Sequence, residues 1–384
     1  MYANATALDN LRRRPLPPRL DRWRRARRIA AIALCLCAVP ATVSYLAAIA
    51  GPSNSSFVIR SFEWLRDHGA APVASQIESI YYSLNAPATG GPALHSLLGK
   101  GGVAPLAAGT HPPSISPVIL PALPGEGAWV PRETWSGPDP PVQITQFRSD
   151  PRYPRMVAGV AWISAARTTI SLNPGRLEPS TTSPSLSMRG AMEVPPASRS
   201  RLLATFNSAF KLSDSGGGFA YGGRTYAPLR PGIATLVHYR DGRIDIQAWS
   251  GAGQVPPGVD FARQNLPLIV QDRQPNPNLS GGPQWGATLG NAVRVWRSGL
   301  GIDARGNLIY AAADAQTVES LAAILIRAGA VRAMELDINS YWVSFITYAE
   351  PFAAKPSSLL PNMTRGPERY LTPDDRDFFT VYLR

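Results

Sequence analysis

The feature that most constrains this chain of 384 residues is an uncharged run, Ile29–Ala50, directly behind a strongly basic N-terminus. At about 1.5 Å per residue, a run of this length can cross a hydrocarbon core of roughly 30 Å. Residues 1–28 hold nine arginines against Asp9 and Asp21, whereas uncharged residues 51–53 follow the run. Because basic flanks stay in the cytoplasm, we expect a single-pass protein of the cell membrane with its C-terminal part outside.

The same segment also has features of a cleavable secretory signal. Residues 48–50, Ala-Ile-Ala, form a small-x-small pattern before Gly51. The apolar run is nevertheless longer than the roughly 7–15 residues of a typical signal peptide, which favours an uncleaved signal-anchor. The only cysteines, Cys35 and Cys37, lie inside the run. The exported part therefore has no disulfides, and its stability must come from core burial.

The formal net charge of +12 does not indicate a nucleic-acid partner. The first 28 residues contribute +7 of this charge, and the remaining +5 is spread along the chain without a basic and aromatic cluster. Nucleic-acid binding proteins carry such a cluster on one face. The membrane is therefore the expected partner of the basic tail.

Behind the apolar run the composition changes twice. Residues 51–100 contain two stretches with apolar residues at helical spacing, Ser56–His68 and Pro72–Leu84, which predict a helical stem. Residues 101–141 hold ten prolines and favour an extended spacer. We expect five parts: a cytoplasmic tail (1–28), an anchor (29–50), the stem (51–100), the spacer (101–141) and a globular domain (142–384).

The globular domain is predicted to be α+β, with a mixed sheet, hairpins and one strand–helix–strand crossover. Asp241-Gly242 and Gly306 each lie between apolar runs, a pattern typical of hairpin turns. A helix is expected from Asp314, as its N-cap, to Gly329. The buried stripe of this helix is predicted to be Val318, Leu321, Ile324 and Leu325. A strand, Val331–Ile338, follows it.

That last strand carries the most informative pair of side chains. Alternation places Glu335 and Asp337 on one face, about 7 Å apart along the strand, and Leu336 on the opposite core face. Ligands of crossover sheets tend to bind at this end of a strand. Two carboxylates so placed can divide the roles of acid and base or nucleophile between them.

Several segments, in this order, resemble the phosphodiester glycosidase family. They are Leu203–Lys211 (LATFNSAFK), the glycine-rich Gly216–Gly223, Arg297–Asp303 (RSGLGID), the helix and Met334–Asp337 (MELD), within a region from Leu203 to Phe345. The resemblance implies a hydrolase acting on a sugar phosphodiester, with Asn207, Arg297 and Asp337 at functional positions. It departs at residues 338–341, where Ile-Asn-Ser-Tyr replaces the family's Gly-Gly-Gly-Ser.

We therefore expect an envelope-anchored hydrolase with Glu335 and Asp337 as its catalytic pair and a carbohydrate or phosphoglycan substrate. Arg297 offers a planar fork for phosphate, Asn207 an amide donor and Trp342 a ring for stacking on a sugar. No cofactor is expected, although a carboxylate-held divalent ion near Asp337 stays open. The alternative is a catalytically silent glycan-binding or envelope-assembly protein on the same fold.

A competing motif is Ser208-Ala209-Phe210-Lys211, an S-x-x-K sequence of the kind found in penicillin-binding serine enzymes. The serine of that motif should open a helix, whereas Gly216 and the glycines behind it would end any helix begun at Ser208. Histidine-based catalysis is disfavoured because the four histidines are scattered along the chain.

Overall fold

The computed structural model describes residues 19–84, 86–91, 94–98, 112–131, 135, 139–180, 189–280, 283–286, 294–349 and 354–384. The chain forms two compact units. The first comprises the residues up to Gly51 together with Ser56–Asp67, and the second comprises Pro52–Ser55 and the chain from His68 onward. Each unit is described by itself below.

The first unit consists of two helices, α1 (Arg19–Ala50) and α2 (Phe57–Leu65). Within the described residues, α1 is the helix that is long and apolar enough to span a membrane, over Trp23–Ala50, a criterion that a signal sequence also meets. The hydroxyl of Ser56 accepts a hydrogen bond from the backbone N–H of Ile59 and caps α2. A helix was predicted at both places from the sequence.

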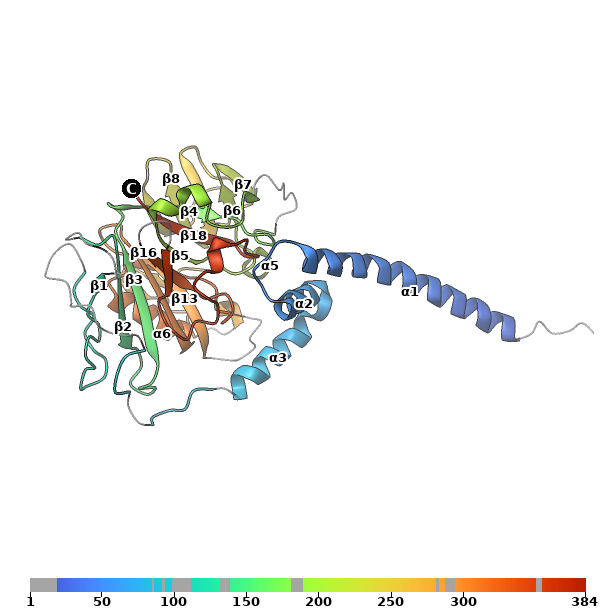
Figure 1. Ribbon diagram of the computed structural model, residues 1–384, viewed down its shortest axis with the longest axis horizontal. Coiled ribbons are helices and arrows are strands. Elements are labelled where there is room, and N and C mark those ends of the chain that lie inside the picture. The colour runs from blue at the N-terminus through green and yellow to red at the C-terminus, as the bar shows by residue number, and fades with distance from the viewer. Residues whose placement is uncertain are drawn as a thin grey trace, which may run out of the picture. The chain divides into compact units, whose positions relative to one another are not determined.

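The second unit is built on three antiparallel sheets (Figure 1). The largest has the order β1-β2-β3-β14-β13-β15-β11-β12, and the two five-stranded sheets have the orders β7-β6-β10-β8-β9 and β17-β16-β5-β18-β4. The strands of the largest sheet are β1 (Val130–Pro131), β2 (Val142–Arg148), β3 (Val157–Ile163), β11 (Val270–Gln271), β12 (Gln274–Pro275), β13 (Val295–Ile302), β14 (Leu308–Gln316) and β15 (Arg332–Glu335). Those of the smaller sheets are β4 (Thr168–Asn173), β5 (Leu202–Asn207), β6 (Phe219–Tyr221), β7 (Arg224–Ala227), β8 (Ala234–Tyr239), β9 (Ile244–Ala248), β10 (Val259–Gln264), β16 (Phe345–Ala349), β17 (Ala354–Ser358) and β18 (Phe378–Leu383).

The predicted hairpins are present at the predicted turns. Strands β8 and β9 pair across a turn in which Gly242 has a φ of 88°, and β13 and β14 pair across a turn in which Gly306 has a φ of 85°. A positive φ costs a residue with a Cβ more than it costs glycine. The strands of these two hairpins supply side chains to the core.

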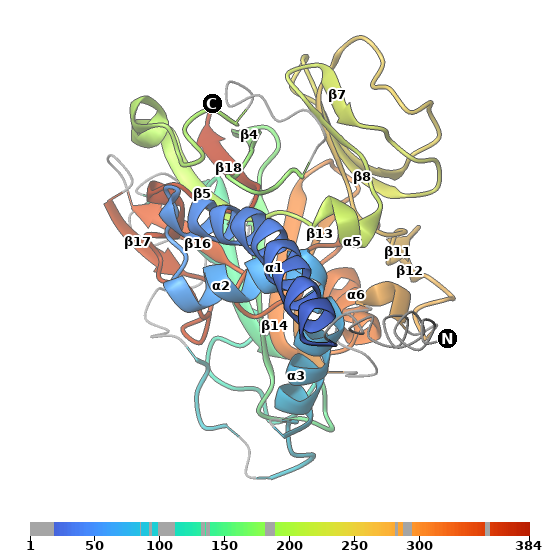
Figure 2. The same cartoon turned by 90° about the vertical axis from the view of Figure 1, so that its right-hand side faces the viewer.

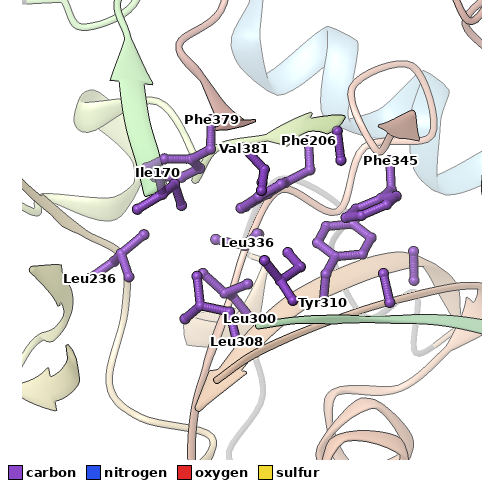
Figure 3. Close-up of a cluster of buried hydrophobic side chains, with 14 of the residues drawn as sticks. Ile170, Phe206, Leu236, Leu300, Leu308, Tyr310, Leu336, Phe345, Phe379 and Val381 are labelled. Atoms are coloured by element: carbon purple, nitrogen blue, oxygen red, sulfur yellow. The ribbon is translucent and has the colours of Figure 1, made fainter. Parts of the chain in front are cut away.

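The main core lies between the largest sheet and the two smaller ones. Phe206 of β5 packs on Phe345 of β16 and Phe379 of β18, with ring centroids 5.9 and 5.2 Å away (Figure 3). Tyr310 of β14 lies 4.9 Å from Phe345, and Leu336 fills the same layer. The predicted core position of Leu336 is therefore confirmed. The predicted strand Val331–Ile338 is shorter in the structure, where β15 ends at Glu335, and Ile338 packs in a second hydrophobic cluster.

The crossover helix α6 (Val318–Arg327), which packs on β14 (Figure 2), connects β14 to β15. Both strands pair with β13 between them. Strands β14 and β15 therefore run parallel to each other, while each neighbouring pair in the described sheets is antiparallel. All four predicted stripe residues of the helix are buried. The predicted N-cap was wrong, because β14 continues through Asp314 to Gln316 and Thr317 caps the helix with Ser320.

Part of the proline-rich segment differs from the predicted spacer. Ile115 and Trp129 are 3% and 2% exposed, and Trp129 donates a hydrogen bond to the carbonyl of Pro113 at 3.0 Å. Residues 112–131 therefore pack on the domain instead of standing apart from it. Residues 101–111 lie outside the described part of the chain, and the remaining domain boundaries stay predictions.

The predicted stem is helical in two pieces. Helix α2 belongs to the first unit, and α3 (Ala71–Leu84) follows a short segment of π-helix, Arg66–Ala70. Gly69 within that segment has a φ of 95°, which interrupts the helical path between α2 and α3. The two apolar patterns seen in the sequence therefore correspond to two separate helices.

Candidate active site

Arg297 and Glu335 meet because β13 and β15 are neighbours in the largest sheet. Gly299 lies directly opposite Glu335 in this antiparallel pair. Residues two apart on a strand share a face, so Arg297 projects from the same face as Glu335. A Cβ on Gly299 would lie 2.9 Å from Leu325 of α6, so this position has no room for a side chain beside Glu335.

Glu335 is fully buried, and only one of its two carboxylate oxygens has a partner in the described chain. Its Oε1 forms an ion pair with Nη1 of Arg297, whereas Oε2 has no hydrogen-bond partner among the described residues. Burial raises the pKa of Glu335 to about 7, against the opposing effect of Arg297 and with a further increase from Asp337. A carboxyl with this pKa exists in both protonation states near neutral pH, as a general acid requires.

The guanidinium of Arg297 makes hydrogen bonds through two of its three nitrogens. Its Nε donates to the carbonyl of Gln316 at 3.2 Å, and Nη1 donates to the carbonyl of Trp285 at 2.9 Å as well as to Glu335. No described residue accepts from Nη2. The guanidinium is thus fixed in orientation, with one amino group left to bind an external anion.

A second buried pair, Arg148–Glu126, shows what a fully satisfied ion pair looks like in this chain. Glu126 Oε1 accepts from the backbone N–H and Nε of Arg148 at 2.9 and 3.0 Å, and Oε2 accepts from Nη2 at 2.7 Å and from Leu123 N at 2.8 Å. Despite burial, these hydrogen bonds lower the pKa of Glu126. The Arg297–Glu335 pair has the opposite properties, an unpartnered oxygen and a raised pKa, which make it a candidate for a functional site.

Asp337 lies just beyond the end of β15 and is held in place from both sides. Its Oδ2 accepts from Nη2 of Arg376 at 2.7 Å, and its Oδ1 accepts from the backbone N–H of Asn339 at 3.0 Å. Its own backbone N–H donates to the carbonyl of Ser208 at 3.1 Å. The ion pair with Arg376 fixes the position of this carboxylate, whose charge raises the pKa of Glu335.

Asn207 occupies the opposite side of β13 and has no spare hydrogen-bonding capacity. Its Oδ1 accepts from Tyr310 and from the backbone of Ser344, and its Nδ2 donates to Ser298 Oγ and to the carbonyl of Ser208. An asparagine side chain has two donors and two acceptor positions, and all four are used. The predicted contact of Asn207 with a phosphate or sugar is therefore not supported, and the residue instead connects the sheets.

Asn207 is still connected to the site through the hydroxyl of Ser298. Ser298 Oγ, which accepts from Asn207 at 3.0 Å, donates to the carbonyl of Asp337 at 2.7 Å. The hydrogen bond fixes the backbone at the point where the chain leaves β15. Asn207 is therefore connected through Ser298 to the backbone of Asp337, two residues beyond Glu335.

Trp342 does not present a ring to a sugar. Its side chain is buried, and the guanidinium carbons of Arg369, Arg376 and Arg365 lie 5.2, 5.3 and 5.8 Å from its ring. Stacking on a sugar requires an exposed face, so the predicted substrate contact is not supported by this arrangement. Trp342 instead packs beside the arginine that holds Asp337.

Three residues that are hydrogen-bonded to Arg297, Glu335 or Asp337 each have a buried side-chain oxygen without a partner in the described chain. These oxygens are Oε1 of Gln316, Oδ1 of Asn265 and Oγ of Ser208. Gln316 contacts Arg297 through its carbonyl, and the Asn265 amide donates to the carbonyl of Glu335 at 2.8 Å. Buried polar atoms are usually satisfied, so a group of orphans marks a place where a ligand can supply the missing donors.

Sequence analysis missed these oxygens and Arg376. The segment Asp374–Asp377 (Asp-Asp-Arg-Asp) is the one signal for Arg376 that the sequence offers, because its charges are dense for a buried C-terminal region. Within the described residues, no group of three or more His, Cys, Asp and Glu side chains could hold a metal ion. The divalent ion considered for Asp337 therefore gains no support from its surroundings.

Comparison with known proteins confirms the family resemblance. Residues 215–337 match the family model described as phosphodiester glycosidase, a region that includes Arg297, Glu335 and Asp337. The match supports a glycosidase-type function at the level of class. No curated protein matches the chain.

Three solved structures share features of the fold. The catalytic domain of zebrafish N-acetylglucosamine-1-phosphodiester alpha-N-acetylglucosaminidase, auto-inhibited by its pro-peptide, is 14% identical with a TM-score of 0.42, over 67% of this chain and 87% of that chain. A hypothetical protein from Synechocystis is 13% identical with a TM-score of 0.36, over 63% and 62%. A putative exported protein from Burkholderia pseudomallei is 12% identical with a TM-score of 0.34, over 62% and 75%.

Proposed function

We propose that this chain is an envelope-anchored hydrolase that releases a sugar from a phosphodiester by carboxylate acid/base catalysis. The family match over residues 215–337 supports the reaction class. The long apolar helix α1 and its arginine-rich flank support the anchoring, with the catalytic domain outside the cytoplasmic membrane.

The observation that carries the proposal is the open half of the Arg297–Glu335 pair. Glu335 Oε2 has no hydrogen-bond partner in the described chain, and Arg297 makes its hydrogen bonds through Nε and Nη1, which leaves Nη2 for a ligand. Leaving a buried carboxylate oxygen unsatisfied costs stability, of the order of 1–3 kcal/mol. The fully bonded Arg148–Glu126 pair shows that the fold does not require this cost.

The proposed reaction divides the work between the two carboxyls. Arg297 Nη2 binds a non-bridging phosphate oxygen, and protonated Glu335 donates its proton to the phosphate oxygen that leaves the anomeric carbon. The C–O bond breaks, and the sugar acquires cationic character that the Asp337 carboxylate stabilises. Water adds to the anomeric carbon and gives up a proton, so the products are a free sugar and a phosphate monoester.

The second candidate function is glycan binding without turnover, and the loop behind Asp337 favours it. Asn339 Oδ1 accepts from the backbone N–H of Tyr341 at 2.9 Å, and its carbonyl accepts from Trp342 and Val343. This loop is closed on itself where the resembling family has glycines. A closed loop brings less backbone to a phosphate than a glycine loop does.

Hydrolysis by the full chain in detergent separates the two candidates. The substrates are a panel of sugar 1-phosphodiesters with the matching plain glycosides, and the measurement is release of reducing sugar. We expect turnover of phosphodiesters, and we expect Arg297→Ala to raise KM for them while affecting the plain glycosides less. Binding of sugars without any turnover, unchanged in Asp337→Asn, would replace the hydrolase by the binding protein.

A further inference from the structure

Helix α2 folds back against the last turns of α1 instead of leading away from it. Trp64 Nε1 donates to Ser44 Oγ at 3.0 Å, and the hydroxyls of Tyr45 and Ser61 are 2.8 Å apart. The rings of Tyr45 and Trp64 meet edge to face, with centroids 5.2 Å apart. The C-terminal half of α2 therefore lies beside the part of α1 that ends the apolar run.

Arg60 fixes the beginning of this contact. Its Nε and Nη2 donate to the carbonyl of Ala48 at 3.2 and 2.7 Å, and Nη2 also donates to the carbonyl of Gly51 at 2.7 Å. The last carbonyls of a helix have no partner within the helix, and a cation at this end is favourable. Helix α1 has no basic residue in its last turn, so Arg60 supplies that cation from α2.

The free side of α2 is apolar. Phe57, Val58 and Leu65 are 61%, 72% and 49% exposed. At 100° per residue, these three side chains fall within one arc of about 100°. Side chains of this size on one exposed stripe are costly in water, because each loses the free energy that burial of an apolar surface would give.

We infer that α2 is an interfacial helix that lies in the outer leaflet of the membrane, with Phe57, Val58 and Leu65 against lipid. Its contact with Ser44 places Trp64 about six residues back along α1 from Ala50, which is roughly 9 Å at about 1.5 Å per residue. Amphipathic helices typically bury their apolar face about 5–10 Å into this boundary. Tryptophan and tyrosine are enriched at the same depth, which suits the Tyr45–Trp64 pair.

A lipid surface fits this stripe better than a second copy of the chain. The stripe belongs to the same compact unit as α1, whose apolar side chains are themselves exposed along the span. A bilayer that receives α1 therefore also reaches the helix bonded to its last turns. The inference goes beyond the proposed activity but rests on the anchoring within the proposed function.

Spin-label accessibility in lipid bilayers tests the inference. The full chain, with Cys35→Ala and Cys37→Ala, is labelled with a nitroxide at Val58→Cys or Leu65→Cys and reconstituted in vesicles. Leu34→Cys in the span and Arg305→Cys in an exposed turn of the domain are the lipid and water references. Collision rates with oxygen, which concentrates in lipid, and with a water-soluble nickel chelate are then compared.

We expect labels at residues 58 and 65 to collide with oxygen as often as the label at residue 34, and at least several-fold less with nickel than the label at residue 305. Values like those at residue 305, with residue 34 still in lipid, would overturn the inference and leave the anchoring intact. Exclusion of both reagents with spin–spin broadening would assign the stripe to a second copy. A water-accessible residue 34 would overturn the anchoring itself, independently of any hydrolysis measurement.

Discussion

At the scale of single residues, two buried arginine–glutamate pairs in the same domain have opposite chemistry. Glu126 accepts five hydrogen bonds and its pKa is lowered, whereas Glu335 has one oxygen without a partner in the described chain and its pKa is raised to about 7. Burial opposes the ionised form of both carboxyls, but Glu335 is the more deeply buried and the hydrogen bonds to Glu126 outweigh burial there. Proton donation near neutral pH is therefore possible at Glu335 and not at Glu126.

The titration of Glu335 and that of Glu126 should change the free energy of unfolding with pH in opposite directions. Above pH 4.5 the unfolded chain loses the Glu335 proton while the folded chain keeps it until about pH 7, so stability falls over this interval by about 3 kcal/mol. Glu335→Gln should remove that fall. Chemical denaturation of the full-length variant and of wild type between pH 4.5 and 8 measures this fall in unfolding free energy.

Glu126→Gln is the matched control. Because the folded-state pKa of Glu126 is lowered, its ionised form stabilises the fold above pH 4.5, and that stability is lost as pH falls. The variant should therefore be less stable than wild type at neutral pH and approach it in acid. The same pH trend in both glutamine variants would contradict the distinction between the two pairs.

At the scale of elements, the segment before β2 is part of the domain. Trp129 and Ile115 are buried, and the Glu126 pair joins this segment to β2. Truncation of a buried tryptophan typically costs about 3–5 kcal/mol. We expect Trp129→Ala to lower the unfolding free energy of the full chain by about that much, as measured by urea denaturation.

Trp23→Ala provides the comparison, because Trp23 is 66% exposed and lies in α1. It should leave the unfolding of the domain unchanged. If Trp129→Ala also left it unchanged, residues 112–131 would be the separate spacer that their prolines suggest.

The elements that the sequence predicts well are those with strong local signals. Gly242 and Gly306 mark their turns because the backbone there requires a positive φ, and the stripe of α6 follows the helical period. The start of α6 was missed because Asp314 is also a good cap by residue type, and only pairing with β13 extends β14 past it. Burial of the proline-rich segment depends on residues distant in sequence, which no local pattern reveals.

The candidate site could likewise be predicted only where a local pattern or the family resemblance indicated its residues. Alternation along a strand predicted Glu335 and Asp337 on one face, but β15 ends at Glu335, so Asp337 lies outside the strand and its shared face with Glu335 stays a prediction. The family resemblance added Arg297. All the hydrogen bonds of the Asn207 side chain are made with other residues of the chain, one of them 137 positions away. Three arginines from a later part of the sequence enclose Trp342. A sequence pattern gives the residue type but not the number of hydrogen bonds already taken.

At the scale of the whole molecule, we propose that the C-terminal domain lies outside the cytoplasmic membrane. The arginines before α1 should hold the N-terminus inside. Protease added to cells with a permeabilised outer layer should digest a tag behind Arg384 and spare a tag before Met1. Protection of the C-terminal tag, with digestion of both tags after lysis, would contradict this topology.

We propose that Glu335 donates a proton to a phosphate oxygen as the sugar leaves. The most direct measurement is hydrolysis of a sugar 1-phosphodiester in ¹⁸O-labelled water, by wild type and Glu335→Gln, across pH. The account predicts label in the released sugar, a wild-type rate that falls as pH rises through about 7, and a variant slower by roughly 10²–10⁴-fold without that fall. Label in the phosphate, or a variant with the wild-type rate and pH profile, would contradict it.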